Sequence, residues 1–201
     1  MTQVTTLAEL EALYGQPARP SLVKVAPRIT PEYRAWIEAA PFCALATAGP
    51  DGLDVSPRGD RGHVASVLDP DTIAIPDRRG NNRLDSLRNV LADPRCALLF
   101  LIPGQGAAIR VNGLARISTD PDLLARFETE GKAPRSLLLV TVSAVYFQCA
   151  RAVMRAGLWE PPVTAPDLPS LGEILATLSE GAEGGPAYDA GLRDRAGRTL
   201  W

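Results

Sequence analysis

Tight-turn signals recur between short apolar segments through the middle of the chain, and they constrain its fold more than any other feature. Gly49-Pro50-Asp51-Gly52 follows one apolar segment, and Asp69-Pro70-Asp71 separates two others. Turns this short join antiparallel strands, whereas parallel strands need long crossover connections. We therefore expect an antiparallel sheet or barrel with the strands Phe42–Thr47, Leu53–Pro57, Gly62–Leu68, Thr72–Pro76, Cys96–Ile102, Ala107–Ser118 and Leu137–Gln148.

Helix signals flank this series of strands. Thr6 and Glu9 form a capping-box pattern, and Thr30 followed by Pro31 marks a second helix start. The predicted helices are Thr5–Tyr14, one from Thr30 to just before Pro41, Asn82–Leu91, Pro121–Glu130 and Ser170–Ser179. The sequence thus predicts a mainly β (α+β) chain in three parts: N-terminal helices that pack on the barrel at 1–40, the barrel at 41–160, and a tail with one helix at 161–201.

Composition excludes several classes of function. The net charge of −2 and the pI near 5.5 do not provide the basic surface that nucleic-acid binding needs. No apolar run approaches the ~20 residues of a membrane helix, and residues 1–10 lack the basic residue of a secretory signal. The cysteines, Cys43, Cys96 and Cys149, are far apart and odd in number, which favours reduced thiols. We expect a soluble cytoplasmic protein without a nucleic-acid or membrane partner, and a single histidine excludes a two-histidine metal site within one chain.

Two polar segments rich in arginine each follow an apolar strand. They are 56–61, Ser-Pro-Arg-Gly-Asp-Arg, and 76–83, Pro-Asp-Arg-Arg-Gly-Asn-Asn-Arg. The second precedes a predicted helix, and the free N–H groups and positive dipole of a helix N-terminus attract anions. Gly80 or Asn81 can take a positive φ there, and the guanidinium groups suit a phosphate: those of Arg78, Arg79 and Arg83. The alternative is a solvated surface turn with scattered ion pairs.

Arg110 adds a further cation within a predicted strand. It alternates with Ile109 and Val111, so its side chain faces away from the apolar side of that strand. This pattern leaves two readings open, contact with a ligand or exposure to water.

The run from Ile75 to Asn89 resembles the signature of a branch of the pyridoxamine 5'-phosphate oxidase-like family. The resemblance extends from Phe42 to about Pro161, and the segments 54–60 and 109–115 also fit the family pattern in order and spacing. It implies an FMN-binding antiparallel split β-barrel with flanking helices. It also implies a homodimer, with the flavin site at the interface between the two subunits.

The resemblance further implies which residues contact the flavin. Candidates along the ring and ribityl chain are Ser56, Arg58 and Asp60. The segment beside the isoalloxazine is Ile75, Pro76 and Asp77. The positions that match the phosphate-binding residues of the family are Asn81, Asn82 and Arg83. Arg110 belongs near the same pocket, and two residues could reach the flavin from the second subunit, namely Arg155 and Trp159.

Departures from the family pattern bear on the substrate. The oxidase itself has Gln at the position of Ala108, and its C-terminal Trp- and Arg-rich segment, which closes over pyridoxamine phosphate, is not reproduced here. The resemblance therefore implies an FMN-dependent oxidoreductase for an unidentified small molecule, with NAD(P)H as a candidate electron donor. The alternatives are a non-enzymatic flavin or haem binder on the same barrel, with His63 as the only histidine available as axial ligand, and a structural dimer with an empty pocket.

Overall fold

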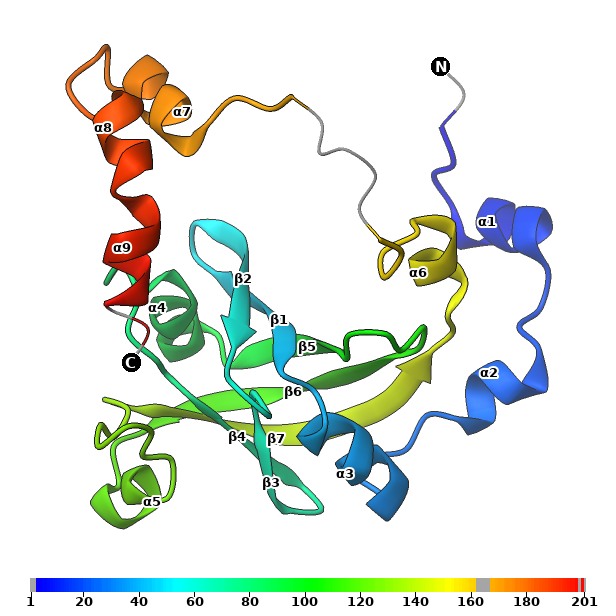
Figure 1. Ribbon diagram of the computed structural model, residues 1–201. Coiled ribbons are helices and arrows are strands. Elements are labelled where there is room, and N and C mark those ends of the chain that lie inside the picture. The colour runs from blue at the N-terminus through cyan, green and yellow to red at the C-terminus, as the bar shows by residue number, and fades with distance from the viewer. Residues whose placement is uncertain (1–2, 162–166, 199, 201) are drawn as a thin grey trace.

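Seven antiparallel strands form one sheet in the order β2-β1-β5-β6-β7-β4-β3 (Figure 1). The computed structural model describes residues 3–161, 167–198 and 200. The sheet does not close, because β2 and β3 remain as its two edges. The predicted fold class is confirmed, an antiparallel split barrel with flanking helices. Its strands are β1 Phe42–Gly49, β2 Gly52–Gly59, β3 Ser66–Asp69, β4 Thr72–Pro76, β5 Arg95–Leu101, β6 Ala108–Ser118 and β7 Leu137–Gln148.

The core lies on the inner face of the sheet. One row of paired residues, Leu45, Leu98, Val111 and Val145, crosses four neighbouring strands, and each member is at most 2% exposed. Alternate residues of these strands point to the other face, which explains the period of two in the sequence. A short helix, α4 (Asp85–Ala92), packs against β1.

Two predicted elements are shorter in the structure than in the sequence analysis. The strand expected from Gly62 begins only at Ser66, because Gly62 has a φ of 86° and breaks the extended backbone. The helix expected over Pro121–Glu130 ends as α5 (Pro121–Ala125). Glu130 and Gly131 then take left-handed φ values of 51° and 74°, which turn the chain back on itself.

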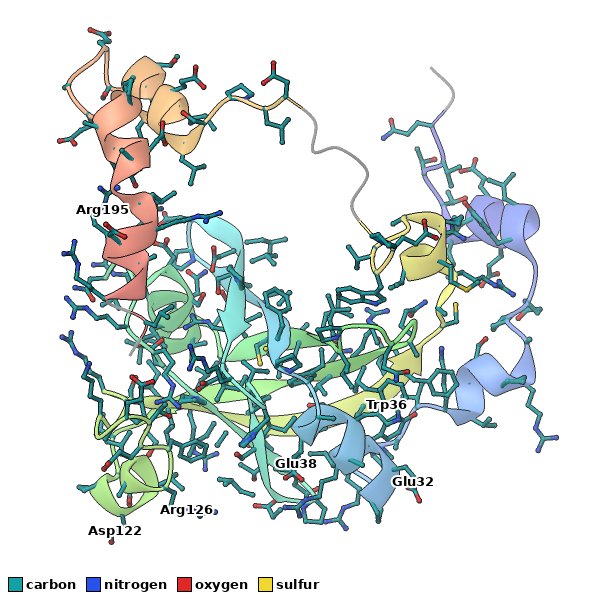
Figure 2. All side chains as sticks on the ribbon, viewed as in Figure 1. Glu32, Trp36, Glu38, Asp122, Arg126 and Arg195 are labelled. Atoms are coloured by element: carbon teal, nitrogen blue, oxygen red, sulfur yellow. The ribbon has the colours of Figure 1, made fainter. Side chains whose placement is uncertain are left out.

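The N-terminal residues form α1 (Leu7–Tyr14), α2 (Arg19–Val23) and α3 (Pro31–Glu38). Only α3 packs into the core: its Ile37 is fully buried, while Glu32 points away from the sheet (Figure 2). No residue of α1 or α2 is buried. Among the N-terminal helices, α3 therefore contributes a buried side chain to the core, whereas α1 and α2 contribute none.

The described part of the tail holds three helices rather than the one expected. After α6 (Arg151–Arg155), the chain forms α7 (Leu171–Leu178), α8 (Gly185–Ala190) and α9 (Leu192–Gly197). The Asp189 carboxylate joins α8 to α7 by accepting hydrogen bonds from Ser170 and Gly172. A helix as short as α8 is not stable by itself and depends on tertiary contacts such as these hydrogen bonds. Its own residues therefore carry little signal from which the helix could be predicted. Across the described residues, none of the helices combines the length and apolar character required to cross a bilayer.

Candidate functional site

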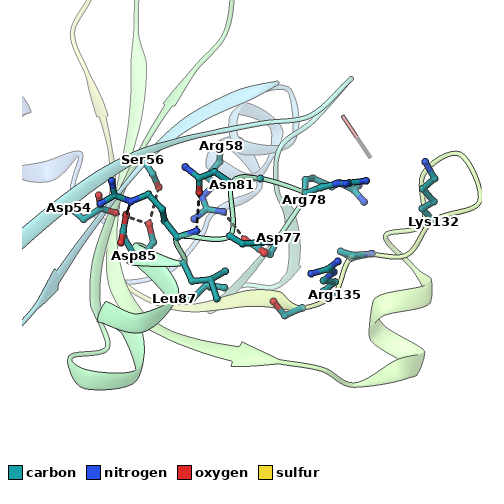
Figure 3. A pocket seen from close by; sticks show the side chains of 18 of the residues that line it. Asp54, Ser56, Arg58, Asp77, Arg78, Asn81, Asp85, Leu87, Lys132 and Arg135 are labelled. Atoms are coloured by element: carbon teal, nitrogen blue, oxygen red, sulfur yellow. Dashed lines mark hydrogen bonds and ion pairs between the residues drawn. The ribbon is translucent and has the colours of Figure 1, made fainter. Parts of the chain in front are cut away.

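A cavity of about 690 Å³ opens between β2, the loop after β4 and the segment before β7 (Figure 3). Its walls carry six basic side chains and three carboxylates. Cavities of this size hold small-molecule ligands and cofactors. The lining residues are Asp54, Ser56, Arg58, the stretch from Asp77 to Leu87, and the stretch from Lys132 to Ser136.

Strand β2 supplies one wall through its alternation. Asp54, Ser56 and Arg58 share its inner face and are half-buried, opposite the buried β1 residues Thr47, Leu45 and Cys43. β2 is an edge strand, and β1 is its only neighbour in the described sheet. The inner face of β2 therefore adjoins the core on the side of β1 and the cavity on its unpaired side. The two-residue period thus aligns three polar groups along one wall.

A chain of hydroxyl groups runs along this wall. The Ser86 hydroxyl donates to the Asp54 carboxylate at 2.8 Å, and the Ser56 and Ser86 oxygens lie 2.9 Å apart. A hydroxyl has one proton, so with the Ser86 proton given to Asp54, Ser56 must be the donor in the second bond. Ser56 therefore presents lone pairs to the cavity and suits a ligand group that donates a hydrogen bond.

Arg58 keeps a buried donor beside the cavity. Its Nη1 forms an ion pair with Asp77 at 2.7 Å, and both side chains are about one-fifth exposed. The Arg58 Nε is buried and has no hydrogen-bond partner among the described residues. A buried donor without an acceptor is costly, and an acceptor atom of a bound ligand would remove that cost.

The loop before α4 and the first residues of that helix line one end of the cavity. Leu84, the residue that precedes α4, provides no side-chain cap, and both Asp85 and Ser86 line the cavity. The left-handed residues are Asn82 at 61° and Leu84 at 62°, not Gly80 or Asn81 as predicted. Helix starts without a side-chain cap offer free N–H groups to an anion.

Two arginines of this loop differ in their partners. Arg83 is largely exposed and pairs with the neighbouring Asp85 at 2.9 Å. Arg78 is mostly buried, pairs with Asp60 at 2.7 Å, and donates to Phe127 O and Thr129 Oγ1. Arg78 therefore fixes the loop to the segment after α5, and the idea that its guanidinium serves a phosphate is not supported by these contacts.

The structure brings together six of the twelve predicted site residues in the cavity: Ser56, Arg58, Asp77, Asn81, Asn82 and Arg83. Asp60 and Pro76 line a smaller adjacent hollow with His63, and Ile75 is buried in the core. Arg110 lies over the Tyr146 ring at 4.9 Å, and the Trp159 indole donates to Gln105 O at 2.7 Å. Within one chain, Arg110, Arg155 and Trp159 do not line the cavity.

Several polar residues of the cavity are absent from the predicted site, among them Asp54, Ser86, Lys132 and Arg135. Asp54 shares the alternation of Ser56 and Arg58, so this pattern could have indicated it. Ser86 needed the position of α4 relative to β2. Lys132 and Arg135 lie about fifty residues further along the chain, and no local pattern points to them. The Asp77 N–H brings their segment to the cavity by donating to Ser136 O at 2.9 Å.

Comparison with protein-family models matches residues 29–149 to the family described as pyridoxamine 5'-phosphate oxidase. The matched residues include α3, α4, α5 and all seven strands of the sheet, which is more than half of the chain. No curated protein sequence matches the chain.

Several solved structures share part of this architecture. HupZ from Group A Streptococcus is 17% identical, with a TM-score of 0.47, over 58% of this chain and 91% of its own. An FMN-binding protein from Syntrophomonas wolfei is 14% identical, with a TM-score of 0.45, over 57% and 82%. An F420 reductase is 22% identical, with a TM-score of 0.42, over 60% and 98%. Because these identities and TM-scores are low, the family assignment rests on the match over residues 29–149.

Proposed function

The chain belongs to the pyridoxamine 5'-phosphate oxidase family, and on this premise we propose that it is an FMN-dependent oxidoreductase acting on a small molecule. The observation that carries the proposal is the cavity in front of α4. Several arginines, two asparagines and the first residues of a helix without a side-chain cap line it. Such a set of donors suits the doubly charged phosphate of FMN.

The residues of the cavity fit FMN in chemistry as well as in charge. Asn81, Asn82, Arg83 and the first amides of α4 would hold the phosphate. The lone pairs of Ser56 suit a donor such as a ribityl hydroxyl or the ring N–H. The unpaired Nε of Arg58 suits an acceptor atom of the ring.

The bound flavin would supply the hydride or electron transfer, and the protein would supply binding, orientation and electrostatics. Arg58, held in place by Asp77, would favour negative charge that develops on the ring during reduction. The walls of the cavity hold no histidine, because His63 lies in the adjacent hollow. This placement favours a flavin over a haem with His63 as axial ligand.

A homodimer is the second part of the proposal. The outer face of β2, β1 and β5 is apolar and uncovered within the described chain: Leu53 is 87% exposed and Val55 is 67% exposed. Register places Val55 beside Ala46 and Ala97, and Pro57 beside Ala44 and Leu99. A continuous apolar patch of this kind is typical of a protein–protein interface, and a second copy satisfies it by twofold symmetry.

The dimer also gives a role to the predicted residues that do not line the cavity. Arg110 pairs with Leu99 on one side and with Tyr146 on the other, so it belongs to the same outer face. In a dimer it would point toward the partner subunit. Arg155 and Trp159 remain candidates for contact with the flavin of the partner subunit.

Incubation with FMN followed by desalting tests the cofactor and the activity together. We expect a yellow protein whose bound flavin is bleached anaerobically by NADPH or NADH and regains its colour in air. Bound flavin that neither nucleotide reduces would identify a binding protein without this donor. A colourless protein that leaves FMN fluorescence unchanged would contradict the proposed cofactor.

A further inference from the structure

The inner face of β2 gives the cavity a direction. Arg58, Ser56 and Asp54 follow one another at every second position, about 7 Å apart. The proposed function sets the flavin ring beside Arg58 and the flavin phosphate at the loop before α4. A ligand that continues beyond that phosphate would therefore run toward Asp54, which Figure 3 places at one end of the cavity with Ser56 and Asp85.

The hydroxyl groups at this end have no proton left for an anion. Ser86 donates to the Asp54 carboxylate at 2.8 Å, and Ser56 must then donate to Ser86, 2.9 Å away. Ser86 is only 4% exposed, so water has little access to these bonds. Two serine hydroxyls alone could bond in either direction, and the carboxylate, which can only accept, selects this one. The wall therefore offers acceptors where a phosphate would need donors.

The charge of Asp54 is not offset by a cation. None of the ion pairs in the described part of the chain involves Asp54, whereas Asp85 is paired with Arg83 at 2.9 Å. The start of α4 contributes only about half a positive charge. Asp54 contributes a full negative charge, so the end of the cavity beyond the phosphate site is unfavourable for a further anion.

The position of Asp54 is fixed by the packing of α4 on the first two strands. Asn89 Nδ2 donates to Thr47 Oγ1 at 3.1 Å, and Thr47 is the register partner of Asp54. Ser86, three residues before Asn89, bonds to Asp54 itself. The helix is thus attached to both members of one cross-strand pair, and the carboxylate cannot turn away without losing the Ser86 hydrogen bond.

We propose that Asp54 is a specificity-determining residue that restricts the cavity to a flavin with one terminal phosphate. Its carboxylate repels a second phosphate directly, and by engaging the protons of Ser86 and Ser56 it removes the donors that such a group would need. The proposal rests on the proposed function, since it takes the phosphate site at the start of α4 as given. The excluded class is a flavin whose phosphate carries a further anionic group, as the diphosphate of FAD does.

Paired titrations with FMN and FAD test this role. The wild type should bind FMN about tenfold or more tightly than FAD, and Asp54→Asn, which keeps the size of the side chain, should remove most of that preference. Asp51→Asn should retain it, because this variant removes the same charge from the exposed turn between β1 and β2, outside the cavity. Since the repulsion is electrostatic, the wild-type preference should also shrink as the salt concentration is raised.

Three results would overturn the assignment. FAD that binds the wild type as tightly as FMN would show that the cavity does not discriminate. A preference that is unchanged in Asp54→Asn would show that FAD is excluded by shape. A preference that is lost equally in Asp51→Asn would show a general effect of net charge.

Failure of the proposed function gives a different result, namely a wild type that binds neither flavin. Titration of the flavin-free variants with phosphate and pyrophosphate then tests Asp54 by itself. The affinity for pyrophosphate relative to phosphate should rise in Asp54→Asn and stay constant in Asp51→Asn. A ratio that is the same in the wild type and in Asp54→Asn would contradict the role of this carboxylate.

Discussion

At the scale of single residues, the partner of each charged group decides what it can do. Arg58, Arg78 and Arg83 all lie at the cavity, yet Arg78 uses its donors on Asp60, Phe127 and Thr129. Arg58 keeps one buried donor, and Arg83 keeps an exposed guanidinium beside Asp85. The three arginines cannot be distinguished by residue type alone. The fold shows that Arg78 has a structural role, whereas Arg58 and Arg83 each keep donor groups that a ligand could use.

The cysteines differ in the same way. Burial raises the pKa of the Cys43 thiol to about 12 and that of Cys96 to about 11. Cys149 is exposed, and the backbone N–H of Arg151 lowers the pKa of its thiol. Because the thiolate is the reactive form, only Cys149 combines access with reactivity.

A thiol count with a coloured disulfide reagent at neutral pH should therefore detect one fast cysteine in the native protein. The other two should react only after unfolding, and Cys149→Ser should abolish the fast phase. Folding stability should also fall as pH rises from about 9 toward 12, since the unfolded thiols lose their protons first. A fast phase that survives in Cys149→Ser would show that a buried thiol is accessible.

At the scale of elements, the sequence predicted the strands well and the connections poorly. Alternation and turn signals placed β1, β4 and β7 nearly at their observed bounds, since burial of one face dictates these patterns. The left-handed residues before α4 could not be predicted. Leucine rarely takes such a φ, so no local pattern indicates that Leu84 turns the chain immediately before α4.

The candidate site was predicted in part for the same reason. Residues next to a strand end or a helix start, such as Ser56 and Asn82, carry a local signal. Lys132 and Arg135 carry none, because only the pairing of β4 with β7 brings their segment to the cavity. The alternation of Arg110 with Ile109 and Val111 predicts that its side chain faces away from the core. It does not predict whether that side chain contacts water, a ligand or a partner subunit.

Strand β6 contains a glycine that the packing of the sheet requires. The register between β6 and β7 shifts after Asn112, and a Cβ at Gly113 would collide with the carbonyl oxygen of Thr141. Gly113→Ala should lower the free energy of unfolding by about 1–3 kcal/mol, measured by urea denaturation. Gly80→Ala, where a Cβ meets open space, should change it little. Equal stability of the two variants would contradict the close approach at the bulge.

At the scale of the whole molecule, an open sheet leaves an apolar face that one chain does not cover. Leu53 and Val55 of β2 belong to this face, and both are exposed within the described chain. Figure 1 shows β2 at one edge of the sheet. A twofold partner would bury these residues and bring the two cavities into one assembly.

Val55→Asp should therefore dissociate the proposed dimer, because it places a charge in the centre of the apolar patch. Val23→Asp is the matched control, since Val23 on α2 is 69% exposed and Val55 is 67% exposed. Sedimentation velocity should give a monomer for the first variant and a dimer for the second and the wild type. A wild type that sediments as a monomer would contradict the interface.

A paired titration of FMN and riboflavin asks whether the loop before α4 is built for a phosphate. We predict that the wild type binds FMN about tenfold or more tightly than riboflavin, because a dianion gains charge-assisted hydrogen bonds there. Arg83→Ala should remove most of this preference, and Arg88→Ala, on the adjacent helix α4 but outside the cavity, should retain it. Equal affinity for the two flavins in the wild type, or a preference that is unchanged in Arg83→Ala, would contradict phosphate binding by the loop before α4.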